Sequence, residues 1–129
     1  MTGEPQPPYG GDGGAASSCV IQRSQIGAVA VVAVSGTVDA LTAPQLQDGI
    51  RAATGSAVAA VVVDLSDVDF LASAGMGVLV ASHAELKPAV RLVMVADGPA
   101  TSRPLKLVGV ADLIEMFATL DDALAAVAS

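Results

Sequence analysis

The sequence predicts an α/β fold: a single domain with a mixed, mostly parallel sheet of about five strands and about four helices. Short apolar stretches alternate along the chain with longer stretches whose apolar residues recur at helical spacing. The first two apolar stretches are too close together for a crossover connection, which predicts an initial antiparallel hairpin. The chain has 129 residues, of which 53% are apolar, enough for one domain with its own core.

The beginning of the chain differs in composition from the rest. Residues 1–18 are rich in Gly, Pro and Ser and offer too little apolar surface to offset the entropy lost on ordering. We therefore predict a disordered tail over residues 1–18 and a folded domain over residues 19–129. Residues 19–23 and 28–35 are expected as the hairpin strands, joined by a turn at residues 25–27. The second strand is continuously apolar, as a central strand should be.

The first helix is expected after a loop at residues 36–39. Thr42 and Gln45 have the spacing of a capping box, in which the threonine hydroxyl satisfies a free N–H of the first turn. The helix is expected to end near Gly55. Its buried stripe is predicted to contain Leu46, Ile50 and Ala53.

The next strand and helix enclose the most informative part of the sequence. A strand is expected at residues 60–65, followed by a loop at residues 66–72. Ser73 is expected as the N-cap of a helix that runs to about Lys87, where Pro88 stops it. The stripe of this helix is predicted to contain Met76, Leu79, Val80, His83 and Leu86.

The remaining elements continue the alternation. A strand at residues 91–96 is followed by a short helix that ends at Gly109, and then by a strand at residues 113–117. Thr119 is expected to cap the last helix, with two aspartates in its first turn, where the helix dipole favours them. The apolar stripe of that helix is predicted to contain Leu120, Leu124 and Val127.

Composition excludes several classes of function. Six Lys and Arg against 13 Asp and Glu give a formal charge of −7, which argues against binding to nucleic acid or to an anionic membrane. One cysteine and one histidine exclude an internal disulfide and a metal site built on several of these ligands. The chain shows neither an apolar stretch of about 20 residues nor a signal peptide, so a cytoplasmic location is expected.

Two glycines stand in the first turn of the helix that begins at Ser73, where each costs up to about 1 kcal/mol relative to alanine. They indicate either tight packing of this turn on the sheet or the close approach of a ligand or another protein. A phosphate on Ser73 would be tolerated at a helix N-terminus. It would also place about two negative charges beside an expected exposed patch of Met76 and Gly77, which would repel a docked partner.

Two short segments carry a resemblance to a known family. Residues 70–77 read Phe-Leu-Ala-Ser-Ala-Gly-Met-Gly, and residues 36–39 read Gly-Thr-Val-Asp. Both are similar, in this order and at these points of the fold, to motifs of STAS domains of the stand-alone anti-sigma factor antagonist type. The similarity extends over about residues 19–126. Ala72 stands where that family usually has Asp, and Thr37 where it has Glu.

The resemblance implies a non-enzymatic switch. Such a protein binds an anti-sigma factor that is also a serine kinase, and thereby releases a sigma factor. The resemblance makes Ser73 the phosphorylated residue and Asp39 an acidic neighbour, with a serine phosphatase to reverse the modification. No cofactor is expected, because the kinase holds the ATP and Mg²⁺. The implied partner-binding residues are Asp39, Ser73, Ala74, Gly75, Met76 and Gly77.

Other functions are weighed against this one. The alternative is a STAS subunit of a transporter or stress-signalling complex, or a module that binds a nucleotide or small anion. A dinucleotide fingerprint fails because Val80 stands at the third glycine position. A serine hydrolase fails because His83, ten residues along the same helix, lies about 15 Å from Ser73. The aspartates at positions 64, 67 and 69 are interpreted as solvated surface residues rather than as a metal site.

Overall fold

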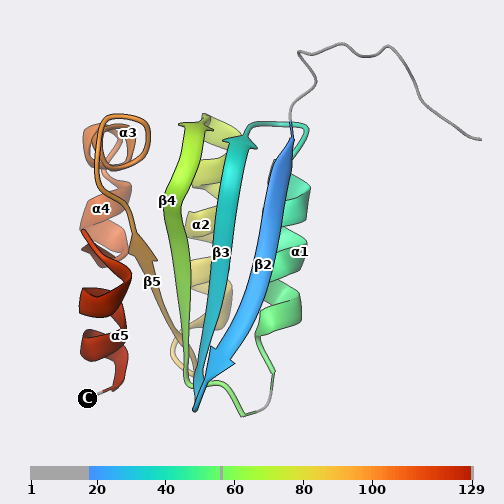
Figure 1. The fold of residues 1–129 in the computed structure, drawn as a ribbon, viewed down its shortest axis with the longest axis vertical. Helices are drawn as coiled ribbons and strands as arrows, with labels where there is room; N and C mark the ends of the chain where they lie inside the picture. The colour runs from blue at the N-terminus through green and yellow to red at the C-terminus, as the bar shows by residue number, and fades with distance from the viewer. Residues whose placement is uncertain (1–17, 56, 129) are drawn as a thin grey trace, which may run out of the picture.

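The computed structural model describes residues 18–55 and 57–128, so the predicted tail lies almost wholly outside the described part. The domain contains one sheet with the strand order β2-β3-β4-β5-β6, covered by helices (Figure 1). The strands are β2 Cys19–Ile26, β3 Val29–Val38, β4 Ala60–Leu71, β5 Arg91–Val95 and β6 Met116–Phe117. The helices are α1 Ala43–Ala53, α2 Ser73–Leu86, α3 Ser102–Leu107, α4 Val110–Leu113 and α5 Leu120–Ala128.

The strand directions confirm the predicted fold class. β2 pairs antiparallel with β3, and the pairs β3–β4, β4–β5 and β5–β6 are all parallel. The sheet is therefore mixed, with the antiparallel hairpin at one edge. None of the helices in the described ranges is long and apolar enough to span a bilayer.

The core lies on both faces of the sheet, and β3 shows why its sequence is continuously apolar. On one face, Val32 and Val34 pack against residues of α1 and α2, including Leu46 and Leu79, all with 2% exposure or less. On the other face, Val29 and Val31 belong to a smaller cluster with Ala123 of α5. A central strand between two helical layers must be apolar at successive positions.

Two strands continue further than the sequence predicts. β4 runs to Leu71, so all but the last residue of the loop expected at residues 66–72 is strand, and β3 runs to Val38, into the loop expected at residues 36–39. Irregularities in the β3–β4 pairing occur between Ala33 and Ser35 and between Gly36 and Thr37. Such bulges interrupt the alternation of inward and outward side chains. This part of β4 therefore lacks the two-residue period by which strands are recognised.

The helix predicted to end at Gly109 is in fact the first of two short helices. Gly109 has a φ of 86° and separates α3 from α4, so residues 18–55 and 57–128 form five helices where about four were expected. A left-handed backbone of this kind favours glycine. α4 includes Leu113, which was expected to begin a strand, and β6 is reduced to Met116–Phe117.

The last helix matches its prediction. The Thr119 hydroxyl accepts a hydrogen bond from the N–H of Asp122, at 3.1 Å, and both aspartates lie in the first turn of α5. The predicted stripe of Leu120, Leu124 and Val127 packs against the sheet, with the fully buried Ala123 between them. The local capping signal was sufficient here, because the hydrogen bond joins residues only three positions apart.

Candidate functional site

The candidate site lies where β3 and β4 end and α2 begins (Figure 1). The two strands are parallel and in register here, with Val38 opposite Leu71, and the N–H of Ala72 donates to the carbonyl of Val38 at 2.8 Å. The chain then turns directly into α2. This connection brings Asp39, which follows β3, and Ser73, which follows β4, to the edge of the sheet formed by the carboxyl ends of its parallel strands.

Ser73 is the first residue of α2 and does not cap it. Ala72 occupies the N-cap position with an extended backbone (φ −87°, ψ 171°) and provides no side-chain cap, so the predicted capping role of Ser73 is wrong. Ser73 is exposed, and within residues 18–55 and 57–128 its hydroxyl makes no hydrogen bond. The fold does not depend on this hydroxyl, which is accessible to an enzyme that modifies serine.

The first turn of α2 packs tightly on the sheet through Gly75. A Cβ on this residue would lie 2.5 Å from Cγ1 of Val38 and 2.8 Å from Cδ1 of Leu71, distances that van der Waals contact forbids. Of the two explanations for the glycines, tight packing is therefore correct for Gly75. Met76 is also buried, with 9% exposure, so its side chain belongs to the core and not to the exposed patch that the sequence suggested.

Gly77 differs from Gly75 because it faces outward. It is exposed, and a Cβ built on it would meet no atom within 4 Å. Neither packing against the described residues nor the backbone conformation requires a glycine here, since the φ of Gly77 is not in the left-handed region. The interpretation that another molecule approaches this turn thus remains a prediction for Gly77.

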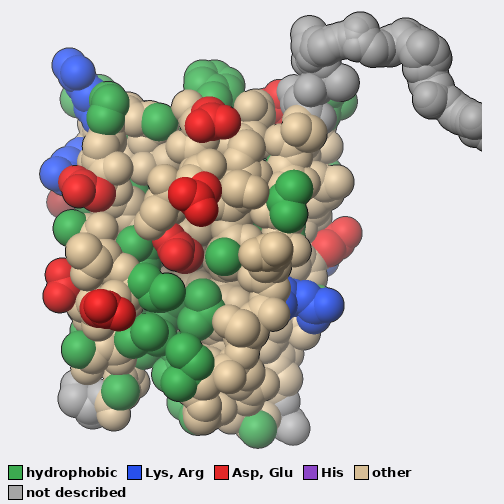
Figure 2. Space-filling view, viewed as in Figure 1, with side chains coloured by type: hydrophobic (Ala, Val, Ile, Leu, Met, Phe, Trp, Pro, Cys, Tyr) green, Lys and Arg blue, Asp and Glu red, His purple; other side chains and the backbone are tan. Residues whose placement is uncertain are grey.

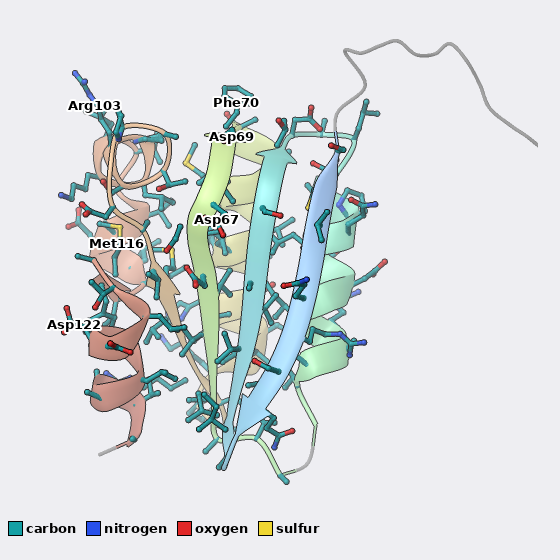
Figure 3. The ribbon with its side chains drawn as sticks, in the orientation of Figure 1. Asp67, Asp69, Phe70, Arg103, Met116 and Asp122 are labelled. Atoms are coloured by element: carbon teal, nitrogen blue, oxygen red, sulfur yellow. The ribbon has the colours of Figure 1, made fainter. Side chains whose placement is uncertain are left out.

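Two exposed apolar residues at this edge were not among the predicted partner-binding residues. Leu41 follows β3 and is 79% exposed, and Phe70, near the end of β4, is 55% exposed. Figure 3 shows Phe70 beside Asp69 at the tip of β4. A large apolar side chain in a polar loop is the only sequence signal that points to Leu41. We call Leu41, Phe70, Ser73, Ala74 and Gly77 the edge surface.

Asp39 organises the loop that presents Leu41. Its Oδ1 accepts hydrogen bonds from the N–H of Leu41 at 2.9 Å and of Thr42 at 3.2 Å. The Thr42 hydroxyl accepts from the N–H of Asp39 at 2.9 Å and donates to the carbonyl of Thr37 at 2.7 Å. This threonine is used by the loop and makes no side-chain cap for α1, so the predicted capping box is wrong.

Cys19 begins β2 next to this loop. It is half-buried, and burial, together with the carboxylate of Asp39, raises the pKa of its thiol. Both causes disfavour the thiolate, which is the reactive form of cysteine. Cys19 is therefore a poor nucleophile in the folded protein.

The three aspartates of β4, at positions 64, 67 and 69, lie outside the buried core. Asp64 accepts hydrogen bonds from the N–H of Ser66 at 3.0 Å and from its hydroxyl at 2.6 Å, and Asp67 and Asp69 are exposed (Figure 3). In the described ranges, no three His, Cys, Asp or Glu side chains are grouped so that they could hold a metal ion. The space-filling view shows these carboxylates as a column over β4 (Figure 2).

Comparison with known proteins gives consistent results. The family model for the STAS domain matches residues 20–123. The chain is 37% identical over 99 residues to the anti-sigma-F factor antagonist RsfB of Mycobacterium tuberculosis, a match that covers 77% of this chain and 81% of that protein. It is 40% identical to a solved anti-sigma factor antagonist from Mycobacterium paratuberculosis, with a TM-score of 0.82 over 87% of this chain and 96% of that one.

A more distant match shows the fold alone. SpoIIAA of Bacillus, solved in its phosphorylated form, is 19% identical, with a TM-score of 0.63 over 84% of this chain and 99% of that one.

The two glycines of the first turn should respond in opposite ways to a methyl group. We expect Gly75→Ala to lower the free energy of unfolding by about 1–3 kcal/mol, because the added Cβ overpacks against Val38 and Leu71. Gly77→Ala should raise it by up to about 1 kcal/mol, since alanine is the better helix former and meets no neighbour. Urea denaturation of both variants measures the difference; equal effects would contradict the packing described for Gly75.

The reactivity of Cys19 tests the position of Asp39. At about pH 8 its thiol should react with a disulfide reagent more slowly in the folded protein than in urea, because its raised pKa leaves less thiolate. Asp39→Asn should accelerate the reaction of the folded protein, since the neutral amide keeps the acceptor oxygen of the loop but removes the negative charge. Asp122→Asn is the matched control. Identical rates for both variants would show that Asp39 does not act on Cys19.

Proposed function

The chain belongs to the STAS domain family. We propose that it is an anti-sigma factor antagonist, which binds an anti-sigma factor on its edge surface. Phosphorylation of Ser73 would release it from this partner. The observation that carries this proposal is the exposed Ser73 hydroxyl, without a hydrogen-bond partner in the described ranges, at the first turn of α2. The two relatives at 37% and 40% identity, both named as antagonists of this kind, support it over a transporter subunit or a nucleotide-binding module.

The edge surface has the composition of a protein-docking site. Leu41 and Phe70 are large, apolar and mostly exposed, and Gly77 leaves the backbone of α2 open to close approach. Apolar side chains at the centre of an interface provide most of its binding energy once water is excluded. The buried Gly75 and Met76 contribute to the site by holding α2 on the sheet, not by touching the partner.

A phosphate on Ser73 would act on docking without disturbing the fold. The first helical hydrogen bonds of α2 run from the N–H groups of Gly75 and Met76 to the carbonyl of Ala72. The N–H groups of Ser73 and Ala74 come before this first bond and so have no acceptor within the helix. Such free N–H groups and the helix dipole accommodate an anion. Toward the partner, the same phosphate would place about two negative charges on the edge surface, where docking would have to desolvate them.

The modifying enzymes would be separate proteins. In this proposal the anti-sigma factor is itself the serine kinase and supplies the ATP and Mg²⁺, while a serine phosphatase restores the hydroxyl. The chain is then a regulatory binding protein with no reaction of its own, acting in the cytoplasm where bacterial transcription takes place. Ala72, in place of the Asp usual in the family, removes one negative charge beside the phosphate.

Two substitutions at Ser73 separate the switch from the fold. Ser73→Asp should weaken binding to the anti-sigma factor at least tenfold, which is about 1.4 kcal/mol, because a charge must be desolvated in an apolar interface. Ser73→Ala should bind like the wild type, with a free energy of unfolding within about 0.5 kcal/mol of it, because the hydroxyl caps nothing. The anti-sigma factor is first identified as the protein that co-purifies with the chain, and is then purified. Calorimetric titration of each variant with it measures the two affinities, and urea denaturation measures the free energy of unfolding. Equal affinities would reduce the chain to a constitutive binding module.

A bulky side chain at Gly77 tests the docking surface directly. Gly77→Arg should leave the circular dichroism spectrum unchanged, since the residue faces open space, but should reduce binding to the anti-sigma factor beyond detection. The control is Gly55→Arg. Gly55 is also exposed, with no atom within 4 Å of its Cβ position, but it follows the carboxyl end of α1, whereas the Asp39 loop precedes the amino end of that helix. Binding retained by a folded Gly77→Arg protein would remove this turn from the interface.

A further inference from the structure

Two basic and two apolar side chains are exposed together on and next to α3. Arg103, Lys106 and Leu107 follow the spacing i, i+3 and i+4, which places them on one face of the helix. Leu107 is 77% exposed and Val108, directly after the helix, is 60% exposed, while Leu105 turns into the core with 0% exposure. We call Arg103, Lys106, Leu107 and Val108 the α3 face.

The two cations of the α3 face, Arg103 and Lys106, form no ion pair within the described residues. Elsewhere, Arg51 forms an ion pair with Glu85 at 3.3 Å and Arg91 forms one with Glu115 at 2.6 Å. Arg103 and Lys106 are two of the six Lys and Arg of a chain whose formal charge is −7, and Asp97 before α3 and Asp112 in α4 are exposed close to them in the sequence. Because no ion pair engages these two cations in the described residues, they remain able to pair with carboxylates of a partner.

The α3 face lies at the same end of the molecule as the edge surface. α3 follows the carboxyl end of β5 as α2 follows that of β4, and in Figure 1 α3 lies level with the tips of β3 and β4. Figure 3 places Arg103 at this end, as it does Phe70, and Figure 2 shows a basic side chain at the corresponding corner, with basic and acidic side chains below it. A partner seated on the edge surface could extend across this end of the sheet to α3.

We propose that the α3 face is a second contact for the anti-sigma factor and binds an acidic segment that carries an apolar side chain. This inference rests on the proposed function, since it extends the same docked partner. The guanidinium of Arg103 and the ammonium of Lys106 would pair with carboxylates, while Leu107 and Val108 would be covered by the apolar side chain.

A membrane surface fits the same residues less well. Recognition of anionic lipid by sequence usually takes clusters of about four to eight basic residues, and this face has two. α3 has six residues, which is short for an amphipathic helix that lies in a lipid interface. The overall negative charge would oppose approach to an anionic membrane.

The test compares variants of the α3 face with matched controls on β2. Arg103→Glu should weaken binding to the purified anti-sigma factor about fivefold or more, with the loss shrinking as salt rises from about 50 to 300 mM, because screening reduces the charge contribution. Leu107→Ser should weaken binding by a similar factor with little salt dependence. The controls, Arg23→Glu and Ile26→Ser, change an exposed cation and a 56% exposed apolar residue of β2 and should stay within twofold of the wild type.

The outcomes separate this inference from the proposed function. If the wild type and Ser73→Asp bind as proposed but Arg103→Glu and Leu107→Ser bind like the wild type, the second contact is wrong and the edge surface stands. If the wild type does not bind an anti-sigma factor at all, both proposals fall. Binding of the wild type to phosphatidylglycerol vesicles that Arg103→Glu abolishes, with unchanged affinity for the anti-sigma factor, would assign the α3 face to a membrane instead.

Discussion

The contact between the first turn of α2 and the ends of β3 and β4 determines the geometry of the whole site. Gly75 has no side chain because Val38 and Leu71 fill the space that its Cβ would need. The hydrogen bond from Ala72 to Val38 fixes the same turn from the backbone, at 2.8 Å. Once Gly75 faces the sheet, the period of the helix decides the rest: Met76 enters the core, whereas Ser73 and Gly77 face outward.

This division gives the two kinds of residue in the turn different tasks. The buried residues make the position of the turn insensitive to what happens outside it, since the close-packed contact has no room to shift. The exposed Ser73 is not held in this way, because its hydroxyl makes no hydrogen bond within residues 18–55 and 57–128. In the proposed switch, a phosphate on Ser73 would therefore alter docking while the domain stays folded. The Asp39 loop completes the arrangement by holding Leu41 outward with two hydrogen bonds.

Local sequence signals predicted the cap of α5 but failed at α1, where the Thr42 hydroxyl bonds to the loop, and at α2, whose start depends on where β4 ends. Thr119 caps α5 as predicted, because only the next few residues matter. Ser73 does not cap α2, because pairing with β3 extends β4 to Leu71 and makes Ala72 the boundary residue. Ser73 is exposed, and its role as the phosphorylated residue stays a prediction. Met76 is buried, as the apolar stripe predicted for this helix requires, and the expectation that it also forms an exposed patch with Gly77 is wrong.

Hydrogen–deuterium exchange of the chain, alone and bound to the anti-sigma factor, tests the central claim most directly. The account predicts that binding slows exchange in two separate segments, the Asp39 loop before α1 and the first two turns of α2, which the fold joins into one edge surface. Exchange in the hairpin turn at Gly27, at the opposite end of β3, should stay unchanged. Protection confined to the hairpin, with none around Ser73, would contradict the claim that this edge is where the partner docks.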